Sequence, residues 1–112
     1  MANFLITDDT VTVELSGLEK VEAGHGNLTI PRSAITSAEV VPDGMDQVRG
    51  FKVLGTGLPG VIEAGTFRGS QGSLFAVCHG RKPAVVLRLT GQRHDVVVVT
   101  VENAEEVAAA LG

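Results

Sequence analysis

The chain has few of the residues on which reactive, disulfide-bonded and nucleic-acid-binding proteins depend. Its 112 residues include one cysteine, Cys78, four phenylalanines, and no tryptophan or tyrosine. A single cysteine excludes an internal disulfide framework and favours a reducing compartment. So few aromatic side chains argue against the stacking platforms that bind single-stranded nucleic acid.

Basic residues are also scarce. Nine Lys and Arg residues stand against thirteen Asp and Glu residues, which gives a formal net charge of −4. Nucleic acids and anionic membranes are both bound through basic patches, so we expect neither as a partner.

Long apolar runs and a leader pattern are absent. Residues 1–9 lack a basic segment and reach Asp8 and Asp9 after three large apolar residues, which is not typical of a signal peptide. No stretch approaches the roughly 18 apolar residues of a membrane-spanning helix. We therefore expect a soluble, cytoplasmic protein with a single domain over residues 1–112, whose hydrophobic content of 44% is enough for one core.

The residues that are abundant favour β-strands. Val11 and Val13 alternate with Thr10 and Thr12, a pattern typical of a strand with one buried face. Similar apolar or alternating segments predict strands over 4–7, 10–15, 27–30, 34–41, 61–68, 73–79, 84–89 and 95–101, joined largely as sequential hairpins in a meander. The expected core consists of Val11, Val13, Ile30, Ile35, Val40, Ile62, Phe67, Phe75, Val77, Val85, Leu87, Val97, Val99, Val107 and Leu111.

Two segments predict helices. Over 16–24, Ser16 and Glu19 have the spacing of a capping box, Leu18 and Val21 are three residues apart, and Gly24 can end the helix. At the C-terminal end, Asn103 and Glu106 have the spacing of a second capping box, and Val107 and Leu111 lie four apart on an apolar face. The predicted fold class is therefore mainly β with one C-terminal helix (α+β), plus a short extra helix near 16–24.

One glycine-rich segment is a candidate ligand site. It comprises Gly55, Thr56, Gly57, Leu58, Pro59 and Gly60, which we expect to form a loop that could offer backbone N–H groups to an anion. It lacks the Gly-Lys-Ser/Thr ending of a phosphate-binding P-loop, and a predicted strand follows it. The alternative is a tight turn at a corner of the sheet, where glycine permits positive φ angles.

Metal and catalytic signatures are missing. His25, His79, His94 and Cys78 do not have the spacing of zinc ligands, and the apolar neighbours of Cys78 indicate a buried thiol with a raised pKa. We expect no metal, no cofactor and no catalytic residues, so the chain is not predicted to be an enzyme.

The best basic cluster is Arg81 and Lys82, at the tip of a predicted hairpin, with Arg68 near a neighbouring turn. Such tips are usually solvated turns. The first hairpin, Thr7 to Thr10, is acidic, which opposes phosphoinositide binding.

Several segments resemble a known family: Gly65–Arg68, Phe75–His79, Pro83–Leu89 and Val97–Leu111, together with 18–23, Val40–Val41 and 55–61. They resemble the bacterial pleckstrin-homology-like domains, in particular a group of small uncharacterised single-domain proteins common in actinobacteria. The resemblance implies a seven-stranded, strongly bent antiparallel sheet or barrel, capped at one end by the C-terminal helix. It implies no catalytic residues. Under this resemblance, the helix near 16–24 is an addition.

These observations favour a non-catalytic binding module that contacts another protein, or a second copy of itself, through an exposed sheet edge or face. One alternative is a small-molecule or anion-binding domain that uses the Gly55–Gly60 loop, and a second is an enzyme of unknown reaction. A deep polar pocket that contains His25 or His94 and the glycine loop would favour the alternatives.

Overall fold

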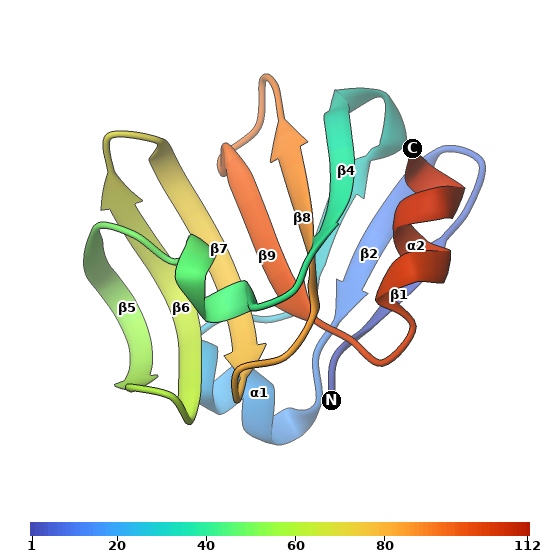
Figure 1. Ribbon diagram of the computed structural model, residues 1–112. Coiled ribbons are helices and arrows are strands. Elements are labelled where there is room, and N and C mark those ends of the chain that lie inside the picture. The colour runs from blue at the N-terminus through green and yellow to red at the C-terminus, as the bar shows by residue number, and fades with distance from the viewer.

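The computed structural model describes residues 1–112 and contains nine strands and two α-helices (Figure 1). The strands are β1 (Asn3–Ile6), β2 (Thr10–Glu14), β3 (Leu28–Pro31), β4 (Ile35–Val41), β5 (Phe51–Leu58), β6 (Ile62–Gly69), β7 (Gly72–His79), β8 (Ala84–Leu89) and β9 (Val96–Thr100). The helices are α1 (Gly17–Ala23) and α2 (Ala104–Leu111), and two short 3₁₀ turns cover Arg32–Ala34 and Gly44–Gln47. The mainly β, α+β class predicted from the sequence is confirmed.

The strands form two sheets. The smaller sheet has the order β1-β2-β3, and the larger has the order β4-β8-β9-β7-β6-β5. Helix α2 packs against β4 and β8, close to the small sheet in Figure 1. No helix is both long and apolar enough to span a membrane.

The topology differs from the expected antiparallel meander. Strand β9 lies between β7 and β8 and runs parallel to β7, so residues 80–83 connect two strands that are not neighbours. The large sheet is therefore mixed. It is also open, with β4 and β5 as its two edges. The resemblance implied a seven-stranded antiparallel sheet or barrel, and this was wrong in strand number and in the parallel β7–β9 pair.

Both faces of the large sheet are covered, which explains why its central strands are apolar throughout. Phe75, Val77, Val97 and Val99 belong to a core shared with the small sheet and α2. Their chain neighbours belong to a second core on the opposite face, where Met45 of the second 3₁₀ turn contributes. Strands buried on both faces read as continuous apolar runs rather than as alternating ones, as Val96–Thr100 does.

The predicted core is largely confirmed. All of its members are buried except Ile35, Val40 and Leu111, which are half-buried and pack against the main core. Leu111 lies in the last turn of α2, where less of the chain surrounds it than surrounds Val107.

Helix α1 begins and ends as predicted, but it buries a different face. The Ser16 and Glu19 capping box forms, and Gly24 ends the helix with a φ of 63°. However, Leu18 and Val21 are exposed, whereas Glu19 and Ala23 are buried. Glu19 faces inward because one carboxylate oxygen accepts the Ser16 N–H while the other lies near His79 of β7.

Helix α2 also begins at the predicted position. Asn103 is its N-cap residue, but its side chain makes no capping hydrogen bond. The predicted capping box with Glu106 was therefore wrong. Glu105 and Glu106 lie in the first turn, where their negative charges interact favourably with the positive end of the helix dipole.

Candidate functional site

The glycine-rich candidate loop is mostly strand. Residues Gly55, Thr56, Gly57 and Leu58 belong to β5 and pair with β6, and the turn consists of Pro59, Gly60 and Val61. The prediction that all of 55–60 is a loop was therefore wrong.

The glycines in this segment have a structural reason. Gly55 lies opposite Gly65 with φ angles of 138° and 143°, and a Cβ atom on either would collide with the backbone of the other strand. Here glycine allows two strands to approach closely beside the irregular register between Lys52 and Leu54. Residues Gly55–Leu58 therefore pair with β6 as a strand and do not form a loop that encloses an anion.

The histidines and the cysteine are arranged in part as predicted. Cys78 is fully buried, and burial raises the pKa of its thiol to about 12. This agrees with the buried thiol of raised pKa expected from its apolar neighbours. No group of three or more His, Cys, Asp or Glu side chains is arranged to hold a metal ion.

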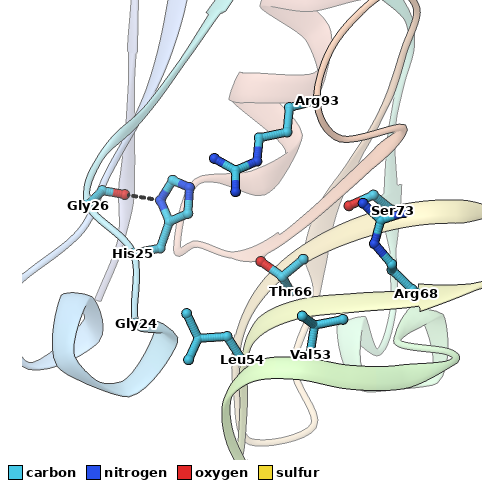
Figure 2. Close-up of a pocket in the computed structure, with 9 residues that line it drawn as sticks. All are labelled: Gly24, His25, Gly26, Val53, Leu54, Thr66, Arg68, Ser73 and Arg93. Carbon is cyan, nitrogen blue, oxygen red and sulfur yellow. Dashed lines mark hydrogen bonds between the residues drawn. The ribbon is translucent and has the colours of Figure 1, made fainter.

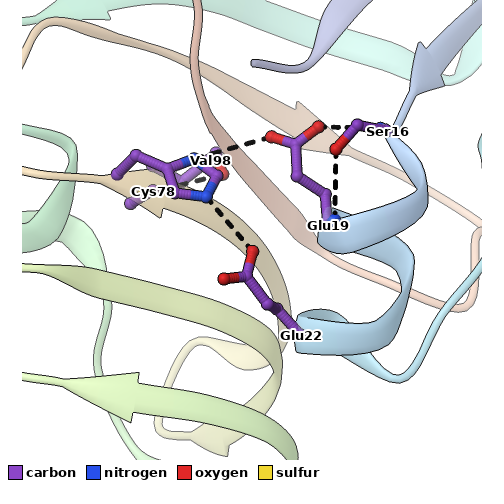
Figure 3. A network of polar contacts seen from close by, with 6 residues as sticks. Ser16, Glu19, Glu22, Cys78 and Val98 are labelled. Atoms are coloured by element: carbon purple, nitrogen blue, oxygen red, sulfur yellow. Dashed lines mark hydrogen bonds and ion pairs between the residues drawn. The ribbon is translucent and has the colours of Figure 1, made fainter.

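His79 attaches α1 to the large sheet. Its Nδ1 atom lies 3.5 Å from Oε2 of Glu19, and its Nε2 atom lies 3.3 Å from Oε1 of Glu22. Figure 3 shows both glutamates reaching from α1 toward the large sheet, with Glu19 also bonded to Ser16. This cluster positions the helix, and the residues that follow it enter the pocket described next.

Of the predicted basic cluster, Arg81 and Lys82 are exposed as expected, but Arg81 is paired and Arg68 lies elsewhere. Arg81 pairs with Asp43 at 2.7 Å and with Asp46 at 3.0 Å, so its charge is compensated. Arg68 is not beside it; it lies instead at a separate pocket that also contains Arg93. Sequence reasoning missed Arg93.

Arg68 and Arg93 line a pocket of about 400 Å³, which we call the basic pocket. Its walls come from the turn after α1, from β5, β6 and β7, and from the loop between β8 and β9 (Figure 2). The lining residues are Gly24, His25, Gly26, Val53, Leu54, Thr66, Arg68, Ser73 and Arg93. The pocket contains His25, as the alternatives required, but only Leu54 borders the glycine-rich segment.

Three packed rings, those of His25, Phe75 and His94, support one side of the basic pocket. The ring of His25 lies 4.8 Å from Phe75 and 5.9 Å from His94, measured between ring centroids. His94 is only 3% exposed, and its Nδ1 atom lies 3.0 Å from Oγ of Ser73. Burial lowers the pKa of His94, and the nearby His25 and Arg93 lower it further.

Ser73 and His94 form a pair, but the pair lacks the third group of a catalytic triad. The other ring nitrogen of His94, Nε2, is buried and has no hydrogen-bond partner. Asp95 accepts the backbone N–H of Ser73 instead, at 2.9 Å. No carboxylate therefore orients the imidazole as a general base.

A third feature is the exposed edge of the large sheet. Strand β5 has no neighbour beyond β6, and Phe51 is 83% exposed, Val53 58%, Leu54 55% and Leu58 54%. Lys52 is the only charged residue of the strand. An apolar edge strand with so few charges is a surface on which another strand can pair.

Comparison of the chain with protein-family models, curated proteins and solved structures found no match.

Proposed function

We propose that this protein is a non-catalytic binding module that associates with a second copy of itself through the free edge of β5. The observation that carries the proposal is the exposure of apolar side chains along an unpaired edge strand. Natural sheets usually protect such edges with charges, proline or a covering element. Here Lys52 is the only charge, no proline lies within the strand, and the irregular register lies at its start, between Lys52 and Leu54. A β-bulge also protects an edge, so the segment that we propose to pair is Leu54–Leu58.

The sequence of β5 is suited to pairing with itself. Leu54 and Leu58 lie four residues apart, two positions either side of Thr56, and all three share one face of the strand. If the β5 strands of two copies pair in antiparallel fashion with the two-fold axis at Thr56, Leu54 of each copy lies opposite Leu58 of the other. The interface then contains two such leucine pairs. Such an isologous contact closes as a dimer and leaves no further edge at β5.

The position of Lys52 agrees with this arrangement. It lies near the start of β5, outside the Leu54–Leu58 segment. Antiparallel pairing about Thr56 therefore keeps the two lysines at opposite ends of the interface, whereas parallel pairing in register would place them side by side. Like charges directly opposite each other destabilise a pair of strands.

Sedimentation velocity over a range of protein concentrations tests the proposal. We expect the wild type to dimerise and Leu58→Lys to stay monomeric, because the substitution places a charge opposite Leu54 of the partner copy. The matched control is Leu5→Lys, at a side chain 52% exposed on β1, an edge strand of the other sheet. It should dimerise like the wild type.

Either of two results would overturn the proposal: a wild type that is monomeric at all concentrations, or a Leu58→Lys variant that dimerises as well as the control. Far-UV circular dichroism establishes that both variants are folded.

We also propose that this chain is related to the bacterial pleckstrin-homology-like domains. Its support is the terminal helix α2 packed on β4 and β8 and the mainly β architecture. The parallel β7–β9 pair is the feature that departs from it.

A further inference from the structure

From its charge and shape, we infer that the basic pocket binds a small organic dianion, of the size and charge of a four- or five-carbon dicarboxylate. This inference does not depend on the proposed dimer.

The first step concerns charge. Arg68 and Arg93 both line the pocket, and neither forms a salt bridge or a side-chain hydrogen bond with the rest of the chain. No Asp or Glu is among the lining residues. Both arginines are exposed, so water solvates the two guanidinium groups in the free protein. A ligand with two negative charges would balance them, and guanidinium groups bind carboxylates through paired hydrogen bonds.

The second step concerns the direction of the hydrogen-bonding groups. His25 Nδ1 lies 2.7 Å from the carbonyl oxygen of Gly26. A carbonyl only accepts, so Nδ1 carries the proton, and Nε2 of the neutral ring is an acceptor that gives no hydrogen bond to an anion. The donors of the pocket are therefore the two guanidinium groups and the hydroxyl groups. Figure 2 shows the ring beside the guanidinium of Arg93, while Arg68 approaches from the side of Ser73.

The hydroxyl groups add donors. Thr66 makes no side-chain hydrogen bond within the chain, and the partner of Ser73 Oγ is Nδ1 of His94. Because an unpaired buried N–H is rarer than an unpaired buried acceptor, the unpartnered Nε2 of His94 is assigned as the acceptor. Nδ1–H then donates to Ser73, and the serine proton is free to donate into the pocket.

The third step concerns the carbon part of the ligand. Val53 and Leu54 of β5 form an apolar part of the wall. A volume of about 400 Å³ exceeds what a bare inorganic ion fills and lies in the range of small-molecule sites. A hydrocarbon chain between two carboxylates would cover the apolar wall while each end meets an arginine.

Isothermal titration calorimetry with succinate tests this inference. Butyrate is the matched control ligand because it has the same number of carbons and a single charge. We expect saturable binding of one succinate per chain, and butyrate binding weaker by about tenfold or more. Inorganic phosphate, the third ligand, should also bind more weakly because it makes no contact with Val53 and Leu54.

Matched variants identify the site. Arg68→Gln and Arg93→Gln should each weaken succinate binding by about tenfold or more. Arg88→Gln, on an exposed arginine of β8 that lies 3.9 Å from Glu39, should leave it unchanged. Urea unfolding establishes that each variant is folded. The Leu58→Lys variant should bind succinate whether or not the wild type dimerises, which separates this test from that of the proposed function.

The inference is overturned if succinate at about 10 mM shows no binding. It is equally overturned if phosphate or butyrate binds as tightly as succinate, or if loss of Arg88 weakens binding as much as loss of Arg68 or Arg93.

Discussion

At the scale of single residues, we expect His94 to make the stability of this protein depend on pH. Its pKa lies below the ordinary value of 6.5, mainly because the ring is buried. The unfolded chain binds a proton at the ordinary value, so below about pH 6.5 the unfolded state holds more protons than the folded state. The contribution of this residue to the free energy of unfolding is therefore complete above that pH and is lost as the pH falls.

We expect the wild type to lose more stability than His94→Leu between about pH 7 and about pH 5, because the variant has no imidazole to protonate. Urea unfolding at both pH values measures the difference. If both proteins lose the same stability, His94 does not cause this pH dependence.

Single residues also differ in how well the sequence predicts their surroundings. The burial of Cys78 follows from its apolar neighbours, so it was predicted correctly. The sequence did not predict that Arg68 and Arg93 line the same pocket, because Arg68 belongs to β6 and Arg93 to the loop between β8 and β9. No local pattern contains both residues. Unpaired charges become visible only when the surrounding carboxylates have been placed.

At the scale of elements, His79 is one of the residues that attach α1 to the large sheet. Glu19 is 2% exposed, and its Oε2 atom has no hydrogen-bond partner, with the ring of His79 3.5 Å away. We expect His79→Leu to reduce the free energy of unfolding by about 1–3 kcal/mol, because the buried carboxylate loses its polar neighbour.

Urea unfolding checks this value, and the double variant Glu19→Gln/His79→Leu provides the control. It should be more stable than His79→Leu alone, because it removes the uncompensated charge. A double variant that is less stable than His79→Leu would contradict the role assigned to this pair.

Elements were predicted well where local signals determine them. Helix α1 was placed correctly from Ser16, Glu19 and Gly24, which are all local capping residues. Its buried face was not, since the apolar spacing of Leu18 and Val21 indicated the side that is exposed. The strand character of 55–58 was missed for a related reason: glycine favours turns locally, whereas Gly55 here permits the close approach of β6, a contact between separate strands.

At the scale of the whole molecule, strand order was the least predictable property. The four residues between β7 and β8 have the composition of a hairpin turn, yet β9 is inserted between these strands. The pairing is reinforced by Asp95, whose backbone N–H and carboxylate bond the backbone of Ser73 at 2.7 Å and 2.9 Å. Such a choice between partners depends on contacts across the fold and leaves no periodic signal in the chain.

The distribution of charge over the whole molecule leads to a prediction about membranes. Each Lys or Arg near an anionic surface contributes about 1 kcal/mol of attraction. Here Arg81 is paired with Asp43 and Asp46, Arg68 and Arg93 lie in the basic pocket, and the net charge is −4. We therefore expect no co-sedimentation with phosphatidylserine or phosphoinositide vesicles at physiological salt, because overall repulsion exceeds the attraction of the few free cations.

Saturable vesicle binding that was lost in Arg81→Gln/Lys82→Gln would contradict this expectation and locate a membrane site at residues 80–83. Vesicle binding that was lost instead in Arg68→Gln would show that the basic pocket receives a lipid headgroup, and the small organic dianion would then be the wrong ligand.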